Sequence, residues 1–182
     1  LFWQQLFTPM PGLAVDLAEL DAGDPVPTGD GYDVVVYSGV AVPAAPAAPF
    51  LAVATPGGVP GLASTGVAES PAVTLVRGDD PLLRGVDLTT VAIAQSQRVD
   101  ADLGAVLVGG EDAPLIVRGV VGSQRYVYFT FALTDSNLPV QVAFPILGDR
   151  ILTELSGAAL TTEPIEVGEP LPIEPTDSGD AV

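Results

Sequence analysis

The stretch Arg125–Leu155, RYVYFTFALTDSNLPVQVAFPILGDRILTEL, decides the expected fold, because it joins the longest strand-like run to the one long helical pattern. Residues 126–133 are rich in aromatic and β-branched side chains and carry no charge, which predicts a strand buried on both faces. Polar residues 135–137 follow as candidate helix N-caps, and Pro139 suits a first helical turn. We therefore expect a strand, a turn and a helix at the centre of a layered α/β domain.

The expected helix carries one apolar face, whose members recur at three- and four-residue spacing: Val142, Ile146, Leu147, Ile151 and Leu155. Gly157 follows in a position to end the helix. Pro145 lies inside this pattern and cannot donate a backbone hydrogen bond, so we expect a bend near residues 141–144.

The rest of the chain predicts several short strands and a short helix at residues 1–10, whose residues Phe2, Trp3, Leu6 and Phe7 are expected to pack on the sheet as core. The strand-like runs are residues 13–20, 32–40, 50–54, 72–76, 91–99, 105–108 and 115–121. Turn residues separate the later runs, which is typical of hairpins. The expected fold class is thus α/β, with a helix-poor mixed sheet whose second half is antiparallel.

Two motifs resemble a known family. Residues 133–147, LTDSNLPVQVAFPIL, resemble a D-S-(D/N)-L-P-L…A-F-P-(I/L)-L segment of a glutamine amidotransferase-like domain. That domain occurs in bacterial membrane proteins of the aerotolerance (Bat) type, which also contain a von Willebrand factor A domain. Residues 80–88, DPLLRGVDL, are similar to the same family's H-P-L-(L/x)-R-G-V-D-L, with Asp80 where the family often has His.

The resemblance implies a three-layer fold of the flavodoxin or class I glutamine amidotransferase type over residues 1–160. It also implies that the chain is one domain of a larger, membrane-anchored bacterial protein, and we favour the extracytoplasmic side for it. The domain itself is expected to be soluble, because no apolar run reaches the length of a membrane span. Residues 161–182 are acidic and proline-rich, and fit either a tail or the start of a following β segment.

Candidate site residues lie where the expected parallel strands end. Ser38 and Gly39 close a strand that resembles one in class I amidotransferases, and ligands of open α/β sheets bind at such carboxyl ends. Thr55 and Gly57 follow the next strand, near the place where the resemblance puts a cysteine nucleophile in a strained turn. With Asp135, these residues form the expected rim of a degenerate pocket. The glycine-rich residues 55–61 are expected to form a mobile loop.

Composition excludes several chemistries. The chain has no Cys and no His, so cysteine or histidine triads, imidazole acid–base catalysis and zinc sites of the usual kind are excluded. Six Arg and no Lys against 23 carboxylates give a net charge of −17, which disfavours nucleic acid as a partner. We expect no catalytic residue, cofactor or metal. The acidic loop at residues 21–33 lacks the spacing of a calcium loop.

Arg84 is expected to pair with neighbouring aspartates, and Arg118 and Arg125 to face solvent.

Two functions remain open at this point. The first is a non-catalytic amidotransferase-like module that binds a protein partner or serves a structural role. The alternative is a carboxylate-dependent hydrolase built on residues such as Asp33, Asp80 and Asp135. A metal-dependent adhesion site needs Asp-x-Ser-x-Ser, which Asp135-Ser136-Asn137 does not supply.

Overall fold

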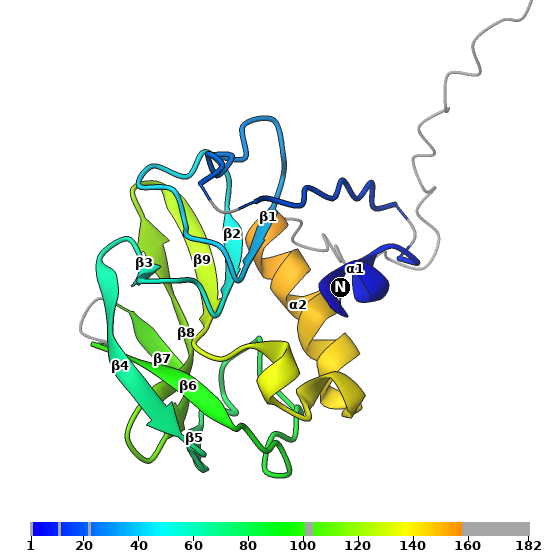
Figure 1. The fold of residues 1–182 in the computed structure, drawn as a ribbon. Coiled ribbons are helices and arrows are strands. Elements are labelled where there is room, and N and C mark those ends of the chain that lie inside the picture. Colours follow the sequence, from blue (N-terminus) through cyan, green and yellow to red (C-terminus); the bar gives the residue numbers. More distant parts are fainter. Residues whose placement is uncertain (1, 11, 22, 101–103, 158–182) are drawn as a thin grey trace, which may run out of the picture.

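The computed structural model describes residues 2–10, 12–21, 23–100 and 104–157, which form two helices, nine strands and two short 3-10 turns (Figure 1). The helices are α1 (Phe2–Phe7) and α2 (Ala143–Ser156), and the 3-10 turns are η2 (Leu133–Asp135) and η3 (Leu138–Val140). The strands are β1 (Val35–Ser38), β2 (Phe50–Val53), β3 (Gly58–Val59), β4 (Leu62–Glu69), β5 (Val73–Val76), β6 (Gln95–Val99), β7 (Ala105–Gly110), β8 (Pro114–Val121) and β9 (Gln124–Phe129).

Six of these strands form one mixed sheet in the order β1-β2-β9-β8-β7-β5. Strands β1, β2 and β9 run parallel, while β9, β8, β7 and β5 pair antiparallel. Strand β9 lies inside the sheet, and its side chains from Tyr126 to Phe129 are buried on both faces. This confirms the expected helix-poor mixed sheet with an antiparallel second half.

Both helices cover one face of the six-stranded sheet (Figure 1). Trp3 of α1 stacks on Phe7 and contacts the rings of Phe129 and Phe144, with ring centroids 5.0–5.7 Å apart. Gly148 of α2 lets the two helices approach closely, because a β-carbon there would lie 2.3 Å from the Leu6 side chain. The predicted aromatic face of the first helix is therefore confirmed as core.

The expected bend at Pro145 is absent for a simple reason. Helix α2 begins at Ala143, so Pro145 is its third residue, where the backbone N–H has no partner within the helix. Of the expected N-cap residues, Asp135 ends η2, Ser136 follows η2 and Asn137 precedes η3, so none of them caps α2. The helix ends as predicted at Gly157, which adopts a left-handed conformation with φ 66°.

The apolar face of α2 differs partly from the expected one. Val142 and Ile146 are 80% and 40% exposed, whereas Leu147, Ile151 and Leu155 are almost fully buried. Val142 precedes the first helical residue, and Ile146 lies at the margin of the buried face. Ala143, Phe144 and Gly148 complete the buried face in their place.

A second sheet covers the opposite face of the six-stranded sheet. Strands β3, β4 and β6 pair in that order, and Val59, Leu62 and Val99 from this sheet pack with Phe50 and Tyr128. The described chain is therefore layered as helices, mixed sheet and small sheet. Strand β4 was not predicted from LASTGVAE, because its small and polar residues hide the strand period.

Two sequence predictions concern segments outside regular structure. Residues 13–20 were predicted as a strand but pair with none, and Leu13, Val15 and Leu17 are exposed. The expected domain boundary at residue 160 and the acidic segment 161–182 lie outside the described residues. Within the described part, no helix is both long and apolar enough to cross a membrane.

The orientation of α2 gives a stability prediction. Ile151→Ala is expected to lower the free energy of unfolding by about 2–5 kcal/mol, because it leaves a cavity between helix and sheet. Val142→Ala, on the exposed side, is expected to change it by no more than about 0.5 kcal/mol. Urea unfolding followed by circular dichroism measures both, and equal losses in the two variants would contradict the assigned face.

Candidate functional site

The parallel strands β1 and β2 end side by side, and the residues that follow them are joined by hydrogen bonds. The Gly39 N–H donates to the carbonyl of Val53 at 2.9 Å, and the Ala54 N–H donates to the carbonyl of Phe129 at 2.9 Å. Ser38 and Gly39 are exposed at this edge. Ala54, directly after β2, has φ 46°, a left-handed conformation that side-chain-bearing residues rarely adopt.

Thr55 lies next to this strained turn and is fully buried. Its hydroxyl donates to the Gly58 carbonyl at 3.0 Å, and its own carbonyl accepts hydrogen bonds from the Gly58 N–H and from Nε2 of Gln97, both at 3.0 Å. The other end of the Gln97 amide accepts the Tyr128 hydroxyl. Thr55, Gln97 and Tyr128 thus form one polar network that ties β2, β6 and β9 together.

Tyr128 is a proton donor in this network. Burial raises the pKa of Tyr128 to about 12, the Thr55 hydrogen bond partly opposes that rise, and the nearby Tyr126 adds to it. The phenol therefore keeps its proton near neutral pH. Its role there is to hold Gln97 against the end of β2.

A hairpin follows the strained turn. Gly57 and Gly58 have φ 79° and 87°, and the chain then enters β3 and β4. A β-carbon on Gly58 would lie 2.2 Å from the Leu62 carbonyl oxygen, so only glycine fits this tight hairpin. The sequence had predicted a mobile loop here, and the hairpin was missed because β3 is two residues long.

Asp135 does not join the other four predicted site residues. It ends η2, and its carbonyl accepts the Ala94 N–H at 2.7 Å. The neighbouring Asn137 fixes the same segment, accepting the Ala92 N–H at 2.8 Å and donating to the Thr90 carbonyl at 3.1 Å. Hydrogen bonds of Asp135 and Asn137 therefore hold residues 90–94 against the turn before α2.

The acidic residues considered for catalysis lie on separate elements. Asp80 is buried in the turn after β5, where it caps the Leu82 N–H at 3.0 Å and binds Arg118 at 2.9 Å. Arg118 also lies 3.9 Å from Glu154 of α2. Two predictions were thus wrong: that Arg84 pairs with the neighbouring aspartates, and that Arg118 faces solvent. Adjacent strands bring Arg118 to this turn, and it is Arg118 that pairs with Asp80. Among the described residues, no three acidic side chains gather as a metal site.

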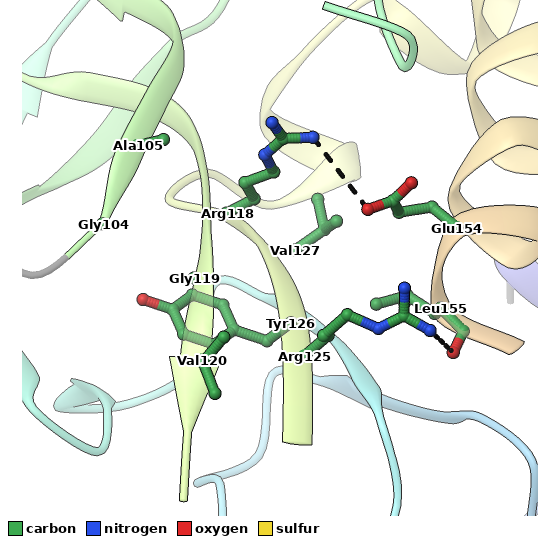
Figure 2. Close-up of a pocket in the computed structure, with 10 residues that line it drawn as sticks. All are labelled: Gly104, Ala105, Arg118, Gly119, Val120, Arg125, Tyr126, Val127, Glu154 and Leu155. Atoms are coloured by element: carbon green, nitrogen blue, oxygen red, sulfur yellow. Dashed lines mark hydrogen bonds and ion pairs between the residues drawn. The ribbon is translucent and has the colours of Figure 1, made fainter. Parts of the chain in front are cut away.

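Two adjoining hollows lie at the opposite end of the sheet. The first, about 520 Å³, is lined by Arg118, Arg125, Glu154 and Leu155 with parts of β7 and β8 (Figure 2). The second, about 450 Å³, shares Arg125 and Glu154 and adds Arg150 and Gly157. Neither includes Ser38, Gly39, Thr55, Gly57 or Asp135, and no pattern in the sequence had singled this surface out.

The Tyr128 network predicts a pH dependence of stability. In the unfolded chain the phenol loses its proton near its ordinary pKa of 10.0, and in the folded chain near 12. Between these values the unfolded state binds fewer protons, so stability falls as pH rises, by up to about 2–3 kcal/mol from this group.

Tyr128→Phe should flatten that part of the profile, measured by denaturant unfolding from pH 9 to about pH 12. The pKa values of Tyr37 and Tyr126 are also raised by burial and remain in both proteins, so the difference between the profiles isolates Tyr128. Parallel profiles for the two proteins would contradict the assignment.

Comparisons with known proteins bear on the fold. No protein-family model matches the sequence, and no curated protein matches it. A cytoplasmic protein of Salmonella typhimurium aligns with a TM-score of 0.54 at 13% identity, over 68% of this chain and 72% of that one. A second cytoplasmic protein of Salmonella typhimurium LT2 aligns at 0.51 and 11% identity, with the same coverage. A β-galactosidase of Bacillus circulans sp. alkalophilus aligns at 0.44 and 14% identity, over 68% of this chain and 22% of that one. The chain therefore resembles the two Salmonella proteins in its mixed α/β fold.

Proposed function

We propose that this chain is a non-catalytic module of the class I glutamine amidotransferase type, as carried by Bat-type proteins with a von Willebrand factor A domain. Its role is to bind a protein partner or to support the structure of a larger, membrane-anchored protein. The single observation that carries the proposal is Ala54, which occupies a strained turn at the carboxyl end of β2 and bears only a methyl group.

The strained turn matters because of what such turns usually present. A nucleophile elbow holds its reactive residue in an unfavourable conformation directly after a strand, so that the side chain projects from the end of the sheet. Ala54 meets the conformational part of this description with φ 46°, one residue before the expected Thr55. Such strain costs of order 1–3 kcal/mol and persists only when the surroundings impose it. The backbone supports an amidotransferase-like origin, and the methyl group supports a module without a nucleophile.

The neighbours of Ala54 favour the same reading. Thr55 and Gln97 are engaged in the buried network, and Tyr128 holds its proton with a pKa of about 12. The chain contains neither Cys nor His. A covalent step at this turn would need a nucleophile with an adjacent base.

Carboxylate chemistry is less favoured by the geometry. Asp33 lies before β1, Asp80 after β5 and Asp135 in η2, so the three belong to different parts of the fold. Asp80 already forms an ion pair with Arg118, 2.9 Å away. A hydrolase would need two carboxylates facing one substrate bond.

An exposed apolar surface favours a role in interaction. Val140 and Val142 are 84% and 80% exposed, and Ile146 is 40% exposed, all within seven residues before and inside the start of α2. Clustered aliphatic side chains on a surface mark protein contact sites more often than isolated ones do. This cluster lies in the segment that carries the family resemblance.

The catalytic half of the proposal has a direct test. The chain, incubated with glutamine and with panels of glycosides and esters, is expected to release no product above the rate of a heat-denatured sample. Turnover that disappears in Asp80→Asn or Asp135→Asn, while circular dichroism stays unchanged, would overturn the non-catalytic assignment.

The membrane-anchored setting of the proposal is tested by the reading frame on both sides of the encoded chain. We expect apolar spans of about 20 residues and an Asp-x-Ser-x-Ser domain in the same protein. A start codon close to Leu1, with neither feature downstream of Val182, would contradict the membrane-anchored module.

A further inference from the structure

Among the described residues, no element covers the helix-bearing face of the sheet beyond the end of α2. Its floor there is formed by Val120 of β8, which is 59% exposed, and by the exposed Arg125 of β9. The two hollows of about 520 and 450 Å³ adjoin along Arg125 and Glu154. Figure 2 shows Arg118 and Arg125 extending from the strands toward Glu154 and Leu155 of the helix. We call this surface the arginine groove; it is lined by Arg118, Val120, Arg125, Arg150, Glu154 and Gly157.

The groove gathers arginines, together with the carboxylates Asp149 and Glu154, in an acidic chain. Three of the six arginines line it, although the net charge is −17. Arg118 is neutralised by Asp80 at 2.9 Å. Arg125 and Arg150 each donate to main-chain carbonyls: Arg125 to Leu155 at 3.5 Å, and Arg150 to Leu82 at 3.4 Å and to Arg84.

Because Arg125 and Arg150 donate to carbonyl oxygens, no carboxylate among the described residues neutralises their charge. Asp149 and Glu154 also line the second hollow, but the ion pairs within 4.0 Å in the described part join neither of them to Arg125 or Arg150. The carbonyl end of α2 partly offsets the charge of Arg125. Hydrogen bonds from arginine to carboxylate are shorter and stronger than those to neutral acceptors, so the groove suits carboxylate ligands.

One source of carboxylates begins at the groove itself. The chain passes Gly157, which lines the second hollow, and continues for 25 residues with six acidic side chains and no basic one. Its central part, EPIEVGEPLPIE at Glu163–Glu174, alternates glutamates with aliphatic residues and prolines. Glutamates match Arg125 and Arg150, and aliphatic side chains match the exposed Val120.

The length of the connection permits this contact. Glu163 follows Gly157 by six residues, which span up to about 20 Å when extended. A short tether also gives the segment an effective concentration in the millimolar range. We propose that the arginine groove binds the acidic segment Glu163–Glu174 of the same chain, through its carboxylates on Arg125 and Arg150.

Because the chain contains no cysteine, a single introduced cysteine can be labelled specifically. In the full chain, Thr176→Cys provides a single attachment point for a nitroxide spin label, and the backbone amides of Val120, Arg125 and Thr153 report on its proximity by line broadening. We expect these amides to broaden, and the broadening to be lost when Glu163, Glu166 and Glu169 are replaced together by Gln. It should also be lost at high salt, which screens charges at a surface.

Matched variants assign the effect to the groove. Arg125→Gln is expected to remove most of the broadening, whereas Arg77→Gln, an exposed arginine beyond β5, should leave it unchanged. Broadening that persists in the triple glutamine variant would overturn the proposal. So would broadening of isotope-labelled chains by spin-labelled chains in a mixed sample, because the segment would then come from a second copy.

Discussion

The burial of strand β9 on both faces is the constraint on which the rest of the structure depends. Tyr128 and Phe129 are wholly excluded from solvent, one packed toward the small sheet and the other toward the helices. Since each face of such a strand must be covered, a chain with two helices in its described part needs a second covering layer. The β3–β4–β6 sheet is that layer, and it also covers the carboxyl end of β2.

The same constraint explains why the two ends of the sheet differ. At the carboxyl ends of the parallel strands, Gln97 of β6 joins the end of β2 to Tyr128, so the turn at Ala54 is held by buried polar contacts. At the other end, α2 ends at Ser156, and Val120 and Arg125 are exposed in the described part of the chain. The two hollows thus lie away from the carboxyl ends of the parallel strands, where ligands of open α/β sheets usually bind.

The sequence predicted features that depend on strong local patterns. The buried strand, the end of the helix at Gly157 and the aromatic core of α1 could be predicted because aromatic runs and glycines act locally. The helix start was predicted too early, because residues 135–137 flank 3-10 turns and do not cap α2. Features set by tertiary contacts were not readable: β4 lacks a hydrophobic period, and Arg118 meets Asp80 only because β8 lies beside the turn after β5. Of the candidate site, the strand ends at Ser38, Gly39 and Thr55 came together, while Asp135 did not. Ala54 was overlooked because a positive φ at an alanine leaves no sequence signal.

The account depends most on the small sheet staying closed over the strand ends, because an opening layer would expose the turn at Ala54. Native-state hydrogen exchange measures this directly. The Gln97 N–H, bonded to the Thr130 carbonyl at 2.8 Å, should exchange with the same free energy as the amides of β9. Exchange of Gln97 at a much lower free energy than Tyr128 would show that the layer opens by itself, and would contradict a permanently filled site.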